Sequence, residues 1–249
     1  MLEARIEKYW TGRANGYSEA IKEDMNSFKK NAWQTIIKEY MGVVDGPIRA
    51  LDVGTGPGFF AVIMAELGYE VTAIDTSSEM LKEAQKNAQF ASFEITAMKG
   101  DAHRIELPDC SFDLVISRNL VWTLPNPMEA YAEWYRLLKP MGKLLVFDAN
   151  WYLRLSDPQL QEKYEACRQE AVKKGYSDGV TLNQHKECEE LARKLPLTYE
   201  KRPEWDKKAL AQCGFNSIDI NKNINDLVYD DKQKTLYCAI PLFAICASK

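Results

Sequence analysis

Apolar and polar positions alternate along the chain in two rhythms, one typical of strands and the other of helices. Strand-like runs occupy residues 48–54, 69–75, 92–101, 112–117 and 142–150. Segments with helical spacing lie between them, and an amphipathic helix is also predicted from residue 18 to about residue 40. Because strands and helices alternate, we expect an α/β fold with a parallel sheet covered by helices.

The rhythm changes after residue 150. Two amphipathic helices are predicted in 151–202, and the sheet rhythm returns at Pro203 with a helix and two further strands. The stretch 225–234 between these last strands is rich in turn-forming residues and predicts a hairpin-like link. We therefore expect an N-terminal helical lid (1–44), a core domain (45–150 and 203–249) and a helical insertion (151–202).

Composition narrows the class of protein. The chain has 249 residues, 46% of them hydrophobic, and a net charge of −4, which excludes a disordered chain and disfavours a nucleic-acid partner. The uncharged run 236–248 is too short to span a bilayer. The beginning of the chain lacks an apolar signal-peptide core, so we expect a cytoplasmic protein without membrane contact. The six scattered cysteines predict free thiols and no metal site.

Glycines and carboxylates follow three successive predicted strands. The sequence LDVGTGPG (51–58) delivers a glycine-rich turn, Asp75 ends the second strand and Asp101 ends the third. Ligands of open parallel sheets bind beyond the carboxyl ends of the strands. Asp75 can accept both hydroxyl protons of a ribose, and Asp101 can accept from an exocyclic amine. The three tips together predict a nucleoside site.

The spacing of the glycines separates two classes of cofactor. A dinucleotide site expects G-x-G-x-x-G, with glycine or alanine at the third position. This chain has Phe59 there, and a bulky ring opposes close packing of the pyrophosphate against the helix. A nicotinamide-dependent oxidoreductase is therefore the weaker alternative.

Four segments resemble the class I S-adenosylmethionine-dependent methyltransferases, in the small-molecule branch that includes ubiquinone- and arsenite-type enzymes. They are LDVGTGPG (51–58), VTAID (71–75), GDA (100–102) and FDLVISRNLVWTL (112–124). The resemblance implies a Rossmann-like, doubly wound sheet of seven strands, mostly parallel and closed by an antiparallel hairpin. It also implies in-line methyl transfer from S-adenosylmethionine to a small-molecule acceptor, leaving S-adenosylhomocysteine. A non-catalytic module that binds the same cofactor is the alternative.

The resemblance assigns cofactor roles by position. The turn residues Asp52, Gly54, Thr55, Gly56 and Gly58 would surround the methionine and ribose, and Asp75 would bind the ribose hydroxyls. The adenine would lie among Thr76, Met80, Asp101, Ala102 and His103. A backbone carbonyl of Ser117 or Arg118 would meet the methionine amino group, and Tyr17 would close over its carboxylate, with Arg13 nearby.

The acceptor side is predicted less sharply. Asn150 and the tryptophans Trp122 and Trp151 follow strand tips and are expected in the substrate pocket, under a cap formed by 151–202. Tyr17, Asp148 and His185 are the candidate general bases. Asp148 and Asn150 resemble the carboxylate–amide pair of metal-dependent catechol methyltransferases, but a third ligand is missing, so no metal is expected. The alternative for the insertion is a dimerisation element, which would make the protein a homodimer.

Overall fold

The computed structural model describes residues 2–44 and 46–249 and has one seven-stranded sheet, in the order β3-β2-β1-β4-β5-β7-β6. The strands are β1 (Arg49–Val53), β2 (Glu70–Asp75), β3 (Thr96–Lys99), β4 (Phe112–Arg118), β5 (Leu138–Asp148), β6 (Ser217–Asn221) and β7 (Phe243–Ser248). The first five are parallel, whereas β7 runs antiparallel to both β5 and β6. The predicted doubly wound sheet with an antiparallel closing pair is confirmed. The order reverses between β1 and β4, which is where such folds bind ligands.

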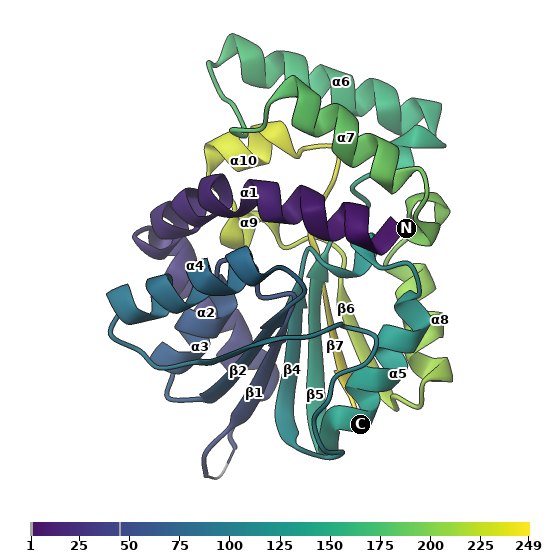
Figure 1. Ribbon diagram of the computed structural model, residues 1–249. Helices are drawn as coiled ribbons and strands as arrows, with labels where there is room; N and C mark the ends of the chain where they lie inside the picture. Colours follow the sequence, from purple (N-terminus) through teal and green to yellow (C-terminus); the bar gives the residue numbers. More distant parts are fainter. Residues whose placement is uncertain (1, 45) are drawn as a thin grey trace.

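Helices cover both faces of this sheet (Figure 1). They are α1 (Leu2–Met25), α2 (Phe28–Met41), α3 (Phe59–Glu66), α4 (Ser78–Phe90), α5 (Pro127–Leu137), α6 (Pro158–Lys173), α7 (Leu182–Ala192), α8 (Glu204–Gln212), α9 (Asn225–Val228) and α10 (Asp231–Leu236). Figure 1 shows α2, α3 and α4 on one side of the sheet and α5 and α8 on the other. Helices α1, α6 and α7 lie above the carboxyl ends of the parallel strands, so they form a roof over the switch point.

Two apolar layers hold the helices to the sheet. On one face Trp33 of α2, Phe60 of α3 and Phe147 of β5 pack with ring centroids 4.8–5.6 Å apart. On the other face Tyr131 and Trp134 of α5 are fully buried. Central strands of a parallel sheet are covered on both sides, which explains why their sequences are nearly continuous apolar runs.

The N-terminal helices differ from the prediction. A single helix over 18–40 was predicted, but α1 already starts at Leu2 and runs unbroken through Gly12 and Gly16 to Met25, and α2 starts anew after Ser27. The Ser27 side chain caps α2 by accepting from the backbone N–H of Lys29. Packing outweighs the low helix propensity of the two glycines, because α1 lies along α4, with Ser18 bonded to Asn87.

The closing segment also departs from its expected form. The stretch 225–234 holds α9 and most of α10 instead of a hairpin-like turn. Earlier in the chain, β5 starts at Leu138, directly after α5, and not at the predicted residue 142. The sequence Asp45-Gly46-Pro47 is also typical of a turn, but Asp45 lies outside the described residues. The order of elements is nevertheless the predicted one.

Two cysteines correct the expectation of free thiols. Cys167 of α6 and Cys238, which follows α10, form a disulfide, whereas Cys110, Cys188, Cys213 and Cys246 are free. The bond ties the insertion to the last part of the chain.

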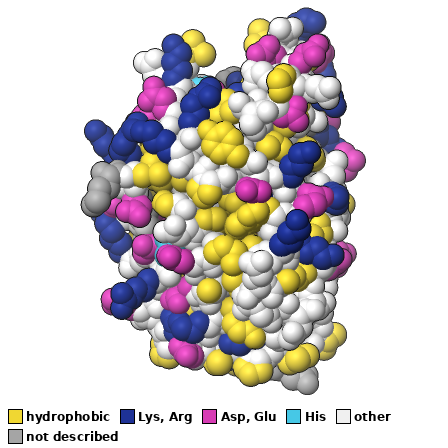
Figure 2. Space-filling view, turned by 90° about the vertical axis from the view of Figure 1, so that its right-hand side faces the viewer, with side chains coloured by type: hydrophobic (Ala, Val, Ile, Leu, Met, Phe, Trp, Pro, Cys, Tyr) yellow, Lys and Arg dark blue, Asp and Glu magenta, His cyan; other side chains and the backbone are white. Residues whose placement is uncertain are grey.

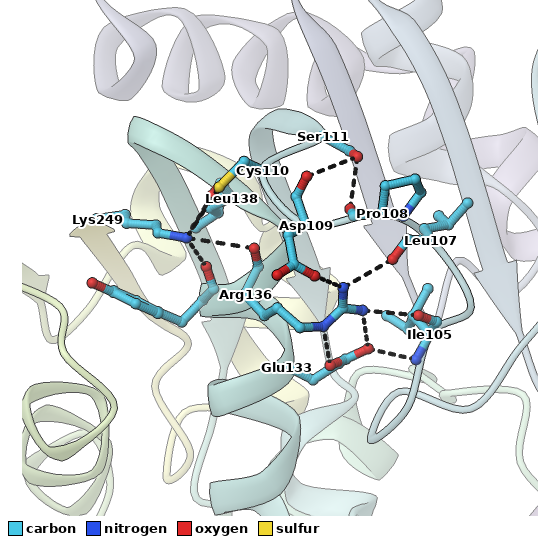
Figure 3. A network of polar contacts seen from close by, with 11 residues as sticks. Ile105, Leu107, Pro108, Asp109, Cys110, Ser111, Glu133, Arg136, Leu138 and Lys249 are labelled. Atoms are coloured by element: carbon cyan, nitrogen blue, oxygen red, sulfur yellow. Dashed lines mark hydrogen bonds and ion pairs between the residues drawn. The ribbon is translucent and has the colours of Figure 1, made fainter.

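A polar network fastens the amino end of β4 to α5 (Figure 3). Arg136 donates to the carbonyls of Leu107 and Ile105 at 2.9 and 3.0 Å and pairs with Glu133 and Asp109. The Lys249 ammonium donates to two carbonyls near the end of α5. These contacts brace the side of the sheet remote from the strand tips.

The face in Figure 2 mixes hydrophobic side chains with charges of both signs, and no stripe of one sign runs across it. Across the part of the chain that the structure describes, no helix combines the length and apolarity needed to cross a bilayer.

Candidate active site

One cavity of about 600 Å³ lies at the carboxyl ends of the strands, under α1 and the insertion. It gathers most of the predicted residues: Arg13, Tyr17, Asp52, Gly54, Thr55, Gly56, Asp75, Thr76, Met80, Asp101, Ala102, His103, Arg118, Trp122, Trp151, Tyr152 and His185. Four predicted residues, Gly58, Ser117, Asp148 and Asn150, do not line it. Segments more than a hundred residues apart thus meet at the predicted edge of the sheet.

The glycine-rich turn needs its glycines for two different reasons. Gly54 has φ +68°, and a Cβ there would stand 2.7 Å from Leu120, inside the cavity wall. Gly58 has φ +88°, and its Cβ would stand 2.9 Å from the Cα of Ala84. Gly58 therefore allows α3 to pack on α4, and the predicted contact of this residue with the cofactor is replaced by a packing role.

Asp75 is held firmly at the tip of β2. Its Oδ2 accepts from the backbone N–H of Gly56 at 3.0 Å, and its Oδ1 accepts from that of Ser77 at 2.9 Å. Burial raises the pKa of Asp75, while these hydrogen bonds oppose the rise. A carboxylate offers about four lone-pair sites, so both oxygens can still accept from a ligand in the cavity.

Asp101 and His103 form a pair at the tip of β3. Asp101 Oδ1 lies 2.6 Å from His103 Nδ1 and accepts from the His103 backbone at 3.0 Å. Because a carboxylate only accepts, we assign the proton of this contact to Nδ1. His103 Nε2 is buried at the cavity and has no hydrogen-bond partner among the described residues. Trp134 fixes the same loop by donating to the Ala102 carbonyl at 3.0 Å.

The tip of β4 presents a cation and an amide. The guanidinium carbon of Arg118 lies 4.7 Å from the ring centroid of Phe59 and 5.1 Å from that of Phe60. Asn119 has φ +56°, and its buried Oδ1 has no described partner. Sequence reasoning missed Asn119, although asparagine at a strand tip is one of the few residues that tolerates this conformation. Ser117 is buried beneath the tip and does not line the cavity.

Asp148 was expected as a general base and Asn150 as a substrate contact, and the structure corrects both. Asp148 is fully buried and accepts from Arg202 Nη1 at 2.5 Å and from the indole N–H of Trp151 at 2.8 Å. Burial raises its pKa, and Arg202 opposes the rise. The Asn150 amide is bonded at both ends to the backbone of Arg202. Both side chains are occupied by structural contacts, so neither is free for an acceptor.

Arg202 is the centre of a network that the sequence did not reveal. Its fully buried side chain lies between Asp148 and Asp206 and pairs with both. The Tyr131 hydroxyl donates to Asp206 at 2.5 Å. Asp148 also accepts from the backbone N–H of Trp122 at 3.1 Å. The network therefore fixes Trp122 and Trp151, which do line the cavity.

The insertion adds charged groups to the cavity wall. Asp178 accepts from Arg168 Nη1 at 2.7 Å, and its Oδ2 lies 3.2 Å from His185 Nε2. Burial alone would raise the pKa of Asp178, but the contacts with His185 and Arg168 hold it below its ordinary value. Sequence reasoning found His185 but missed Arg168 of α6 and Asp178 of the loop after it, because no motif in the insertion marks either residue.

The residues present fit the predicted cofactor. The turn offers a surface without Cβ atoms, Asp75 offers free acceptor positions, and His103 and Asn119 bring unpartnered polar atoms to the same cavity. Within residues 2–44 and 46–249, no cluster of histidine, cysteine and acidic side chains has the makings of a metal site.

Comparison with known proteins supports this picture. Residues 51–146 match the family model of the methyltransferase domain. Demethylmenaquinone methyltransferase of Renibacterium salmoninarum is 34% identical over 114 residues, 46% of each chain. Malonyl-[acyl-carrier protein] O-methyltransferase of Enterobacter lignolyticus is 37% identical over 124 residues, 48% of each chain. The chain thus spans about half the length of the curated relatives it matches.

A solved structure extends the likeness to most of the fold. Phosphoethanolamine N-methyltransferase 2 of Haemonchus contortus, in complex with S-adenosyl-L-methionine, aligns with a TM-score of 0.59 and 22% identity. The alignment covers 86% of this chain and 51% of that one. Residues 51–146 are therefore similar to the methyltransferase domain, and the chain shares its fold with this solved methyltransferase structure.

Proposed function

We propose that the protein transfers a methyl group from S-adenosylmethionine to a small-molecule acceptor. The observation that carries the proposal is the single cavity that joins the glycine-rich turn, Asp75 and the Asp101–His103 pair at successive strand tips. The match of residues 51–146 to the methyltransferase domain supports the same function. That match covers residues 51–146, and we propose methyl transfer for the chain as a whole.

The cofactor roles follow the geometry of the tips. Asp75 would accept from the ribose hydroxyls, while Thr76, Met80 and the Asp101–His103 pair would surround the adenine. The turn at Asp52–Gly56 and the backbone of Arg118 would hold the methionine part. Tyr17 and Arg13, one helical turn apart on α1, would cover its carboxylate.

The chemistry demands little from the protein. Bound S-adenosylmethionine supplies an electrophilic methyl group, so the carbon–sulfur bond breaks as the bond to the acceptor forms. The side chains of this site then have to align the acceptor and exclude water. Where the acceptor nucleophile carries a proton, three groups at the cavity could take it: His185, Tyr17 and His103, whose Nε2 has no partner among the described residues.

We propose that 151–202 acts as a cap over the acceptor side. Its residues Tyr152, Tyr164, Arg168, Asp178 and His185 line the cavity together with Trp122 and Trp151. An enclosed wall of this kind suits a small acceptor and not a nucleic acid. The alternative of a dimerisation element predicts a concentration-dependent mass in sedimentation, with acceptor turnover unaffected by changes in the cap.

Cofactor binding is the first test of the function. We expect S-adenosylhomocysteine to raise the melting temperature and to bind in calorimetry, because a ligand that binds only the folded state stabilises it. NADH at the same concentration should leave the melting temperature unchanged. Absence of a shift with millimolar S-adenosylhomocysteine would contradict the proposal. Methyl release from labelled S-adenosylmethionine in a metabolite library would separate an enzyme from a binding module.

The roof helix α1 gives a second expectation. Trp10, Arg13 and Tyr17 of α1 line the cavity, whereas α2 packs on the sheet, so only α1 of the predicted lid (1–44) covers the site. Amide hydrogen exchange over residues 9–25 should slow when S-adenosylhomocysteine binds. The amides of α5, on the other side of the sheet, serve as the internal control. Equal exchange over 9–25 with and without ligand would make α1 a fixed wall and not a lid.

A further inference from the structure

Arg118 is a cation without a counter-ion in an aromatic wall. Its guanidinium lies over three rings, those of Phe59, Phe60 and Trp33, at 4.7, 5.1 and 5.7 Å from their centroids. The side chain is partly buried and lines the cavity. It makes no hydrogen bond or ion pair with the described residues of the chain.

Three carboxylates at the cavity have other hydrogen-bond or ion-pair partners. Asp52 Oδ2 accepts from the Thr55 hydroxyl at 2.6 Å; burial raises the pKa of Asp52 to about 7, and the charge of Arg118 opposes this rise although the two groups form no ion pair. Asp75 is bonded to the glycine-rich turn, and Asp178 is paired with Arg168 and His185. A cation withdrawn from water without an opposite charge is costly. An anion beside Arg118 would therefore be favoured over a neutral group or a second cation.

The walls next to Arg118 specify the body of the ligand. Tyr17, Trp151, Tyr164 and Tyr237 pack against the same apolar cluster as Phe60 and also line the cavity. Trp151 and Tyr237 meet edge to face at 5.6 Å. The hydroxyl groups of Tyr17 and Tyr237 have no hydrogen-bond partner among the described residues, so they can donate to a ligand oxygen. Such walls favour a flat ring.

An aromatic enclosure alone would also suit a quaternary ammonium group. Arg118 decides between the two, because a fixed positive charge repels a cationic acceptor and attracts an anionic one. A planar guanidinium also matches the two oxygens of a carboxylate. The charge and shape of the wall thus point to the same acceptor.

The cofactor carries a carboxylate of its own, and a second cation is available for it. Arg13 of α1 lines the cavity one helical turn from Tyr17, and it too lacks an ion-pair partner among the described residues. The cavity therefore offers two cations, Arg13 for the carboxylate of the cofactor and Arg118 for that of a second ligand. We propose that Arg118 binds a carboxylate of the methyl acceptor and that the acceptor is a small aromatic carboxylate. This inference rests on the proposed function.

The test uses the full chain loaded with S-adenosylhomocysteine and three matched probes: benzoate, benzamide and benzylamine. We expect wild-type protein to bind benzoate at least about tenfold more tightly than either neutral or cationic probe in calorimetry, the scale of one charge-assisted hydrogen bond. Arg118→Gln should remove this preference and keep the affinity for S-adenosylhomocysteine within about threefold. Arg118→Lys should keep part of the preference, since it retains the charge but loses the planar fork.

The control is Arg13→Gln, which should weaken S-adenosylhomocysteine and preserve the preference for benzoate. Equal binding of the three probes, no binding of benzoate, or a preference that persists in Arg118→Gln would overturn the proposal. So would loss of S-adenosylhomocysteine binding in Arg118→Gln, because Arg118 would then serve the cofactor. If wild-type protein fails to bind S-adenosylhomocysteine, the proposed function falls, and benzoate binding to the ligand-free variants still decides the role of Arg118.

Discussion

Replacing Arg202 with methionine is expected to lower the free energy of unfolding by about 3–5 kcal/mol, the usual loss when one partner of a buried ion pair is removed. Methionine fills much of the same volume but leaves Asp148 and Asp206 buried without a cation. Urea denaturation monitored by tryptophan fluorescence measures the loss. For a domain whose total stability is about 5–15 kcal/mol, the effect decides whether the protein folds.

A matched control is Lys222→Met, which removes the cation of the Lys222–Glu204 ion pair. The Lys222 side chain is 71% exposed. It should change the stability little, because exposed pairs contribute little. Combining Arg202→Met with Asp148→Asn and Asp206→Asn should recover most of the loss, since the unpaired charges disappear. An Arg202→Met protein as stable as the control would refute the electrostatic account.

The pH dependence of this variant has a definite sign. Burial already raises the pKa of Asp148 in the folded protein, and removing Arg202 takes away the charge that opposes the rise. A folded carboxyl group with a raised pKa binds its proton more tightly than the unfolded chain does, so its protonation favours folding. The stability difference between Arg202→Met and wild type should therefore shrink as the pH falls from 7 towards 4.

Replacing Asp75 with alanine is expected to weaken S-adenosylhomocysteine by about 1–3 kcal/mol, or roughly 5- to 150-fold in Kd. The variant loses the ribose acceptor and frees the N–H groups of Gly56 and Ser77. Asp75→Asn should lose less, because the amide keeps one accepting oxygen. Calorimetry measures both, and the exposed Glu106→Ala is the control.

The two roles of Asp75 can be told apart with a ligand that lacks the 2′-hydroxyl. Wild-type protein should prefer S-adenosylhomocysteine to its 2′-deoxy analogue, and Asp75→Ala should bind the two more equally. A full preference for the 2′-hydroxyl in the alanine variant would move the ribose away from Asp75 and leave this residue a structural support of the turn.

The meeting of three candidate residues at one cavity was predictable because each stands at the carboxyl end of its own strand. Gly54, Asp75 and Asp101 each follow a strand, and parallel strands bring their carboxyl ends to one edge. The parallel direction of the first five strands follows from the alternation of strands and helices. The prediction needed no knowledge of long-range contacts.

The acceptor side depends on contacts between distant segments. Asp148 has the sequence context of a free carboxylate at a strand tip, yet Arg202, 54 residues later, occupies it. The path of α1 through Gly12 and Gly16 likewise depends on packing against α4, which helical periodicity does not report. Long-range ion pairs and tertiary packing set these features, and a single sequence records neither.

The bonds between Asn150 and Arg202 join the two ends of the insertion. Two hydrogen bonds cross a separation of 52 residues, and the Asp148–Arg202 pair lies next to them. The point where the chain leaves the sheet and the point where it returns are thus clamped, whatever lies between. Loop-closure entropy rises only slowly with length, so a clamped exit tolerates segments of different length and sequence. The fold can therefore accept a different insertion at this point while the sheet and the residues at its strand tips stay unchanged.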